Sequence, residues 1–363
     1  MHTWLLTMLA GTALALSPLH AASDPLAIGS QPMRQGSSPA RAEMEIAAAD
    51  RSDSDTSVQE TLAAAEGGDP EAQYKLGTMY ADGRTVPRDY SLAATWLKKS
   101  ADQGYSDGQN SLAKMYTSGQ GVTQDYSAAF TLFQQAAAQG NAKAQRNLGI
   151  LYIKGLGTSQ DYATGFAWVS KSAAQGLDYG QMTLGGLYEV GWGVPIDAAM
   201  SFQWYRKAAL QGLAPAQYAV GKLYALGQGT PQDYSLSFEW YKKASDQNFP
   251  EAQFELGIIY ADGVGVRRDM DKAIELYRRS AVQGYADAQY ILGSLYARGY
   301  GVRRDLVEAH MWFNLAAATF SVSEVAKRRE AVKYRDRIAK AMSPAMLAEA
   351  QRRAQIWKPQ GPS

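Results

Sequence analysis

The 363-residue sequence contains no cysteine and only three histidines, His2, His20 and His310. Without cysteine there is no disulfide, no thiolate metal site and no cysteine nucleophile. So few histidines exclude a histidine-rich metal site and leave Ser-His-Asp catalysis with almost no candidate base. Basic and acidic residues nearly balance, 36 against 35, which argues against a strongly basic nucleic-acid-binding protein. We therefore expect no metal, no cofactor and no nucleic-acid partner.

Long apolar runs are also missing, apart from the uncharged segment Leu5–Leu16. This run is shorter than the ~20 apolar residues that a membrane-spanning helix needs. It suits a signal peptide over residues 1–21, cleaved near Ala21 or Ala22, although no Lys or Arg precedes the run and no small residue stands at position −3. An uncleaved anchor is the alternative. Cleavage would place a mature chain with no transmembrane helix in the periplasm or outside a bacterial cell.

Aromatic residues are absent between Trp4 and Tyr74. Residues 22–55 are instead rich in serine, with several prolines and scattered charges. Such a segment cannot bury enough apolar surface to offset the entropy lost on ordering. We expect residues 22–55 to form a disordered linker.

From Ala72 onward the sequence repeats every 36 residues, seven times and without insertion or deletion. Each unit has glutamine at its second position, tyrosine at its ninth, glycine at its twelfth and aspartate at its eighteenth. This period indicates a solenoid. In the first unit, Leu76, Met79 and Tyr80 recur at helical spacing, glycine ends that helix, and aspartate caps a second one. The aspartates are Asp89, Asp125, Asp161, Asp197, Asp233, Asp269 and Asp305.

The pattern A-Q-x-x-L-G-x-x-Y-x-x-G-x-G-V-x-x-D, followed by A-x-x-W-Y-x-K-A-A-x-Q-G, resembles the Sel-1-like repeat family, relatives of tetratricopeptide repeats. Gln217–Gly227 and Ala309–Ala317 match it closely, and the resemblance extends from about Thr61 to Ala317. It implies a right-handed superhelix of helical hairpins with an adaptor role in protein complexes, in bacteria often at the envelope. We therefore expect an all-α solenoid over residues 56–320.

Two amphipathic helices are expected after the repeats, over 324–340 and 344–357. Because the last unit of a solenoid needs a covering surface, we expect residues 321–357 to cap it, with a tail at 358–363. From Glu324 onward ten basic residues face four acidic ones, whereas the first 120 residues contain nine basic and fourteen acidic. The basic end predicts an anionic protein or polymer as a partner.

Partner-binding residues are expected on the concave surface lined by the first helix of each repeat. Trp192, in a loop, is a further candidate anchor, with partial burial under the neighbouring loop as the alternative. Two arginine pairs occupy the same loop position in consecutive units and predict a basic patch with Lys327–Arg329, although ordinary surface charge is the alternative reading. The candidates on first helices are Arg146, Ile150, Lys154, Glu189, Lys222 and Arg298, and those in the loops are Arg267, Arg268, Arg303 and Arg304.

The recurrent residues give little support to a catalytic function. The aspartates precede helices and suit N-caps better than a metal row. Loops such as Gly263–Gly265 follow no strand and precede no Gly-Lys-Ser, so they are not phosphate loops. His310 has no serine or carboxylate partner at suggestive spacing. We predict a non-catalytic protein-protein interaction scaffold of the bacterial envelope. The alternatives are a polysaccharide- or peptidoglycan-associated assembly factor and, more remotely, a hydrolase.

Overall fold

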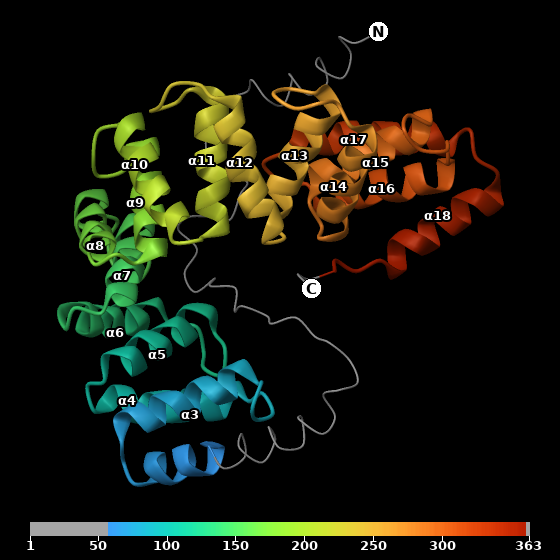
Figure 1. The fold of residues 1–363 in the computed structure, drawn as a ribbon. Coiled ribbons are helices and arrows are strands. Elements are labelled where there is room, and N and C mark those ends of the chain that lie inside the picture. Colours follow the sequence, from blue (N-terminus) through green and yellow to red (C-terminus); the bar gives the residue numbers. More distant parts are fainter. Residues whose placement is uncertain (1–56, 361–363) are drawn as a thin grey trace. The chain divides into compact units, whose positions relative to one another are not determined.

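The computed structural model describes residues 57–360, and the expected signal peptide and linker lie outside this range. Within it every regular element is a helix: a helical segment at 57–66 precedes sixteen labelled helices (Figure 1). No helix of the described range is both long and apolar enough to cross a membrane. The chain divides into two compact units, with the boundary between Gln211 and Gly212, after the fourth repeat.

Each of the seven repeats forms a pair of packed helices, A and B, which confirms the predicted helical solenoid. The A helices of the first unit are α3 (Pro70–Asp82), α5 (Ser106–Ser118), α7 (Ala142–Lys154) and α9 (Asp178–Val190). Those of the second unit are α11 (Ala214–Leu226), α13 (Pro250–Asp262) and α15 (Ala286–Arg298). The B helices are α4 (Tyr90–Asp102), α6 (Tyr126–Ala138), α8 (Tyr162–Ala174), α10 (Ala198–Leu210), α12 (Tyr234–Asp246), α14 (Met270–Val282) and α16 (Leu306–Thr319).

The repeated aspartate and the repeated glycine define the helix ends. Asp125 accepts hydrogen bonds from the backbone N–H groups of Ser127 and Ala128, at 2.9 and 3.0 Å. The aspartate before every other B helix also caps it through its side chain. Every A helix ends at a glycine in the left-handed conformation, such as Gly119 with φ of 70°. The predicted capping role of the aspartates is confirmed.

The second glycine of the G-x-G loop lies against a neighbouring repeat. At Gly121, with φ of +70°, a Cβ atom would lie 2.0 Å from the carbonyl oxygen of Tyr90, the first residue of α4. Only glycine allows this approach of two backbones. The loop therefore serves packing between repeats, as expected from its lack of phosphate-loop context.

The repeated glutamine has a structural role as well. In the first repeat, Gln103 Nε2 donates to Gln73 Oε1 at 2.8 Å, and Gln73 Nε2 donates to the carbonyl oxygen of Ala65 at 3.1 Å. The first bond ties the A helix to the end of its own B helix, and the second ties it to the preceding helical segment. The glutamine-to-glutamine bond recurs in the next five repeats. These amides therefore connect helices and are not available to a ligand.

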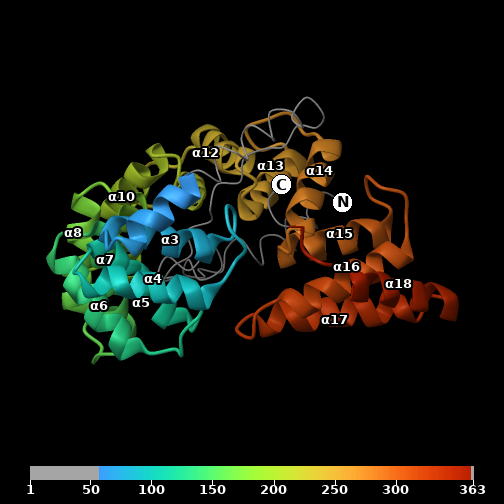
Figure 2. The same cartoon turned by 90° about the horizontal axis from the view of Figure 1, so that it is seen from below.

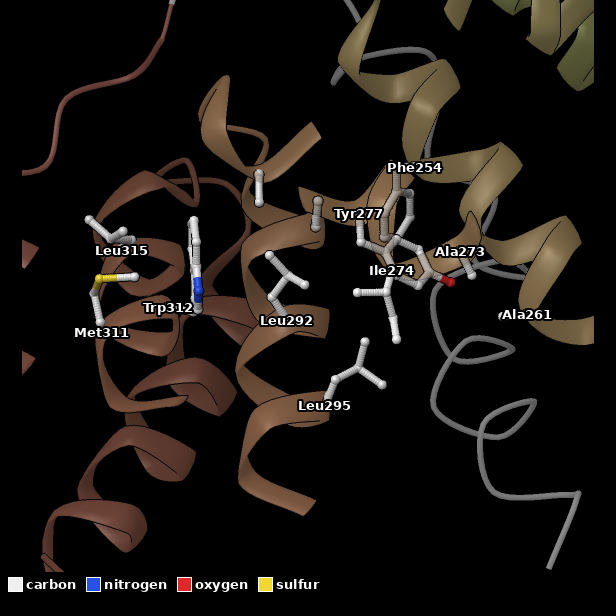
Figure 3. Close-up of a cluster of buried hydrophobic side chains, with 12 residues drawn as sticks. Phe254, Ala261, Ala273, Ile274, Tyr277, Leu292, Leu295, Met311, Trp312 and Leu315 are labelled. Atoms are coloured by element: carbon white, nitrogen blue, oxygen red, sulfur yellow. The ribbon is translucent and has the colours of Figure 1, made fainter. Parts of the chain in front are cut away.

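Aromatic side chains fill the core of the second unit. Phe254, Tyr277, Leu292 and Trp312 belong to one buried cluster that extends over α13 to α16 (Figure 3). A Cβ atom at Gly257, in the middle of α13, would lie 2.5 Å from Cε1 of Tyr277. The mid-helix glycine therefore makes room for the ring of the paired B helix.

Two helices follow the repeats, α17 (Val325–Ala339) and α18 (Pro344–Ile356), and both pack against α16 (Figure 2). The rings of Phe313 and Tyr334 stack with their centroids 5.6 Å apart, which joins α16 to α17. Arg353 pairs with Glu308 at 2.7 Å, which joins α18 to α16. The last repeat of the array is thus covered by polar helices, as solenoid ends require.

Candidate functional site

The A helices of the first unit are linked through polar side chains. Asn147 Nδ2 on α7 donates to Asn110 Oδ1 on α5 at 3.1 Å. Arg146 Nε, also on α7, donates to Thr183 Oγ1 on α9 at 2.9 Å. We call the side of α5, α7 and α9 that carries these residues and Lys114 the first A face. Amide and cationic groups can donate hydrogen bonds to carboxylates and backbone carbonyls.

Positive charge accumulates on the first A face. The guanidinium of Arg146 lies 5.6 Å from the ring centroid of Tyr179 and is only 7% exposed. Burial, with Lys143 and Arg146 nearby, lowers the pKa of the Lys114 ammonium below its ordinary value. Among the described residues no acidic side chain forms an ion pair with Lys114.

Ile150 corrects one of the sequence predictions. It has the same place in its repeat as Lys114, and we expected it on the concave surface, yet its side chain is 0% exposed. It packs with Ile153, Val169 and Leu187 in a buried cluster of the first unit. Ile150 is a core residue because the helix pairs α7–α8 and α9–α10 close over it. It is not a partner-binding residue.

The other candidates of the first unit lie in three different settings. Lys154 is exposed at the end of α7. Glu189 on α9 is half-buried and accepts a hydrogen bond from the Tyr205 hydroxyl at 3.0 Å. Trp192 is half-buried, with its ring 5.6 Å from that of Tyr162. Glu189 and Trp192 are thus half-buried with intramolecular contacts, whereas Lys154 lies at an exposed position.

In each arginine pair of the second unit, the second arginine bonds to the backbone and the first is exposed. Arg268 Nε donates to the carbonyl oxygen of Ala261 at 2.8 Å, and Arg304 Nε donates to that of Ala297 at 3.2 Å. Glutamine does the same elsewhere, as when Gln160 Nε2 donates to the carbonyl oxygen of Ile153 at 2.8 Å. This loop position therefore caps the end of the A helix wherever it is glutamine or arginine, but not in the fourth repeat, where it is Ile196. Arg268 also bonds the hydroxyl of Tyr300 in the next loop, so the two arginine loops are neighbours.

The predicted basic patch is smaller than expected. Lys327 forms ion pairs with Asp287 at 2.9 Å and Glu324 at 3.3 Å. Asp287 is in the first turn of α15, whereas Arg303 and Arg304 follow its last turn. At about 1.5 Å per residue, the thirteen-residue helix separates the two groups by nearly 20 Å. Arg267 and Arg303 remain exposed, but Lys327 belongs to a different site.

Acidic groups gather on the A helices of the second unit. Glu251 and Glu255 lie four residues apart on α13 and so share one side of that helix, and Asp287 lies on α15. Burial raises the pKa of Glu251 to about 7. Burial also raises the pKa of Glu255 to about 7, with Asp287 contributing and Lys222 opposing. We call Glu251, Glu255 and Asp287 the acidic recess.

The sequence analysis did not find the acidic recess. Its three residues occupy positions that differ from repeat to repeat, whereas the search for periodicity favours positions that stay the same. The signal available was the spacing of Glu251 and Glu255 on one predicted helix. Lys222, which was predicted, is half-buried on α11 and acts electrostatically on Glu255. Arg298, also predicted, is exposed at the end of α15.

No arrangement in the described part of the chain resembles a catalytic or metal centre. No three His, Cys, Asp or Glu side chains between residues 57 and 360 are placed to hold a metal ion. His310 is 4% exposed on α16, and burial lowers its pKa, with Arg335 contributing and Asp336 opposing. A hollow of about 500 Å³ borders it between α16, α17 and α18, lined mainly by amide and charged side chains, with no serine or other hydroxyl among them.

The fold defines a helical repeat protein built from seven pairs of helices. Seven consecutive segments match the Sel1 repeat, at residues 70–105, 106–141, 142–177, 179–213, 214–249, 250–285 and 286–318. The chain therefore belongs to the Sel1 repeat family, whose members generally mediate protein-protein interaction on a typically non-catalytic scaffold.

A solved structure agrees with this assignment. The chain is similar to a Sel1 repeat protein from Oxalobacter formigenes, with 33% sequence identity and a TM-score of 0.58, over 76% of this chain and 80% of that chain. It is also similar to c5321, a protective antigen present in uropathogenic Escherichia coli strains that displays an SLR fold. That similarity has 30% identity and a TM-score of 0.40, over 82% of this chain and 73% of that chain. No curated protein matches the chain significantly.

Proposed function

We propose that the protein is a non-catalytic scaffold of the bacterial cell envelope that binds partner proteins through its A faces. The observation that carries this proposal is the charged chemistry of those faces. Recessed Lys114 on one unit, and Glu251 and Glu255 on the other, are ionisable groups whose pKa values burial shifts toward the neutral form. Charges held this way favour a partner of complementary charge over solvent.

Export rests on the segment Leu5–Leu16 and the alanines that follow it. Mass spectrometry of the protein recovered from its native cells should find a mature N-terminus near Ala22 or Ser23. Fractionation should recover the shortened chain from the periplasm or the medium. An intact Met1 on a chain confined to the cytosol would contradict the envelope assignment.

The binding surface is tested by photo-crosslinking in cells. A photoreactive amino acid is placed at Ser111 or Lys222 on A helices, and at Thr131 or Glu239 on B helices as matched controls in the same units. We expect protein adducts from the A positions and few from the B positions. Equal labelling from both sets would refute binding through the A faces. Adducts to peptidoglycan in place of protein would favour the assembly-factor alternative.

A further inference from the structure

The acidic recess holds one buried carboxylate oxygen to which no described residue donates a hydrogen bond. The side chain of Glu251 is only 9% exposed, and its buried Oε2 has no hydrogen-bond partner among the described residues. A buried carboxylate oxygen without a donor is unfavourable for folding. Such a group in a natural fold suggests that a donor is supplied from outside the chain.

The three carboxylates surround the same two rings. Glu251, Glu255 and Asp287 all act electrostatically on the hydroxyls of Tyr218 and Tyr285, and together with burial they raise the pKa of both tyrosines. Asp287 also acts directly on Glu255. Glu251 is therefore directed into a cluster and is not an isolated buried acid.

The positive charges of the fold only partly neutralise this cluster. Lys327 on α17 pairs with Asp287 and also with Glu324. Lys222 on α11 acts on Glu255 at longer range and is not within ion-pair distance of it. Two lysines thus face four carboxylates, and the recess retains negative charge.

The surroundings of the carboxylates select an organic cation over a metal ion. Tyr218 and Phe249 have ring centroids 5.6 Å apart, and Phe254 and Tyr285 have theirs 5.3 Å apart. Aromatic rings beside carboxylates attract guanidinium and ammonium groups by cation–π and charge-assisted contacts. The described acidic groups, by contrast, are not placed to chelate a metal.

We propose that the acidic recess of Glu251, Glu255 and Asp287 binds an arginine or lysine side chain from a basic segment of a partner protein. This inference rests on the proposed binding function of the A faces and specifies the partner's chemistry at the second one. The cation would pair with the carboxylates and supply a donor to Glu251. Binding is therefore expected to need an extended basic segment that can enter the recess.

The test uses the full chain and fluorescently labelled peptides that alternate arginine with serine. Matched peptides replace arginine by glutamate or by glutamine. Fluorescence anisotropy should show binding of the arginine peptide alone, weakening as salt is added. The double change Glu251→Gln with Glu255→Gln should weaken binding about tenfold or more, because two facing carboxylates are lost.

The control changes two exposed acids on B helices of the same unit, Glu239→Gln with Glu275→Gln, which gives the same change in net charge. It should leave affinity within about twofold, since exposed charges contribute little at a distance. Equal weakening by both variants would overturn the proposal in favour of a general charge effect. So would an arginine peptide that does not bind the unmodified chain. If the double variant does not fold, the single variant Glu255→Gln, at a partly exposed site, provides the test instead.

The pH dependence of binding provides a second readout. Glu251 and Glu255 have pKa values raised to about 7, so affinity for the arginine peptide should increase from about pH 6 to about pH 8 as both ionise. Lys327, whose pKa is raised by Asp287, stays protonated over this range, and the tyrosines, with raised pKa values, stay neutral. The double glutamine variant should lose this dependence. Partners could crosslink at Ser111 and Lys222 while the double glutamine variant binds the arginine peptide as tightly as the unmodified chain. That result would leave the proposed function standing and refute binding at the recess.

Discussion

The A helices of the two units of the protein bury or half-bury different charged side chains. In the first unit the A helices carry half-buried Lys114 together with the buried side chains of Arg146, Asn110 and Asn147. In the second unit the A helices present Glu251 and Glu255 beside Asp287. The helix pairs, caps and glutamine bonds beneath both faces are the same. The repeat therefore fixes the scaffold, while a few variable positions set the chemistry of each face.

The charge of a face does not follow the charge of the surrounding sequence. The first 120 residues have an excess of acids, yet the first A face is cationic. The end of the chain has an excess of bases, yet the second unit contains the acidic recess. Many of the remaining charges lie on B helices in solvent-exposed pairs, such as Lys98 with Asp102 at 2.7 Å. Such pairs contribute to net charge but little to recognition.

The largest expected effect is on the free energy of unfolding, at a repeat position that is buried in the first unit and half-buried in the second. Ile150 and Ile258 both occupy the seventh position of their repeats, but Ile150 is fully buried and Ile258 is half-buried. Ile150→Ala should lower the free energy of unfolding by about 3 kcal/mol because it leaves a cavity. Ile258→Ala should cost about 1 kcal/mol, in proportion to its smaller buried area. Urea denaturation measures both.

Hydrogen exchange localises the two losses. Peptides from α7 should exchange faster in the Ile150 variant and those from α13 in the Ile258 variant. Equal costs at the two positions would mean that the exposure of this position does not differ between the units.

The next effect is the dependence of stability on pH, which should have opposite signs in the two units. Glu251 and Glu255 have folded pKa values near 7, above the usual 4.5, so the folded state binds more protons between these values. Stability of the second unit should therefore fall as pH rises from about 5 to about 7. For the deeply buried Glu251 the loss should reach about 2–3 kcal/mol. Lys114 has a lowered pKa, so the first unit should gain stability as pH rises toward 10.5.

Melting temperatures measured from pH 5 to pH 8 check the acidic part of this prediction. Glu251→Gln with Glu255→Gln should remove most of the decrease, since the amides do not titrate. The control pair Glu239→Gln with Glu275→Gln should keep it. A decrease that persists in the recess variant would place its origin elsewhere.

The sequence predicts the scaffold well because the scaffold repeats. The aspartate caps, the left-handed glycines and the helix pairs all depend on local backbone chemistry, and each appears several times in the chain. Two features escaped prediction for a tertiary reason. Burial of Ile150 depends on how neighbouring helix pairs close, and the acidic recess forms only when α13 and α15 lie side by side. The division after Gln211 falls within an uninterrupted period and has no sequence signal.

The smallest expected effect on stability is at the loop position that caps an A helix, which is Gln160 in one repeat of the first unit and Arg268 in one repeat of the second. Each donates to a backbone carbonyl, so Gln160→Ala and Arg268→Ala should both cost about 0.5–1 kcal/mol. Arg268→Gln should be nearly neutral, because glutamine already makes this bond in other repeats. Arg267→Gln, at an exposed neighbour without such a bond, should change stability by less than about 0.5 kcal/mol.

Urea denaturation of the four variants separates capping from charge at this position. If Arg268→Gln cost as much as Arg268→Ala, the positive charge itself would be required, and the arginine loops would differ in kind from the glutamine loops. Binding of the sulfated polymer heparin adds a second measurement. Should the loops recognise anions, Arg267→Gln with Arg303→Gln will weaken that binding and its salt dependence while leaving stability intact. If instead heparin binding is unchanged in this variant, Arg267 and Arg303 are ordinary solvated charges, and recognition is left to the A faces.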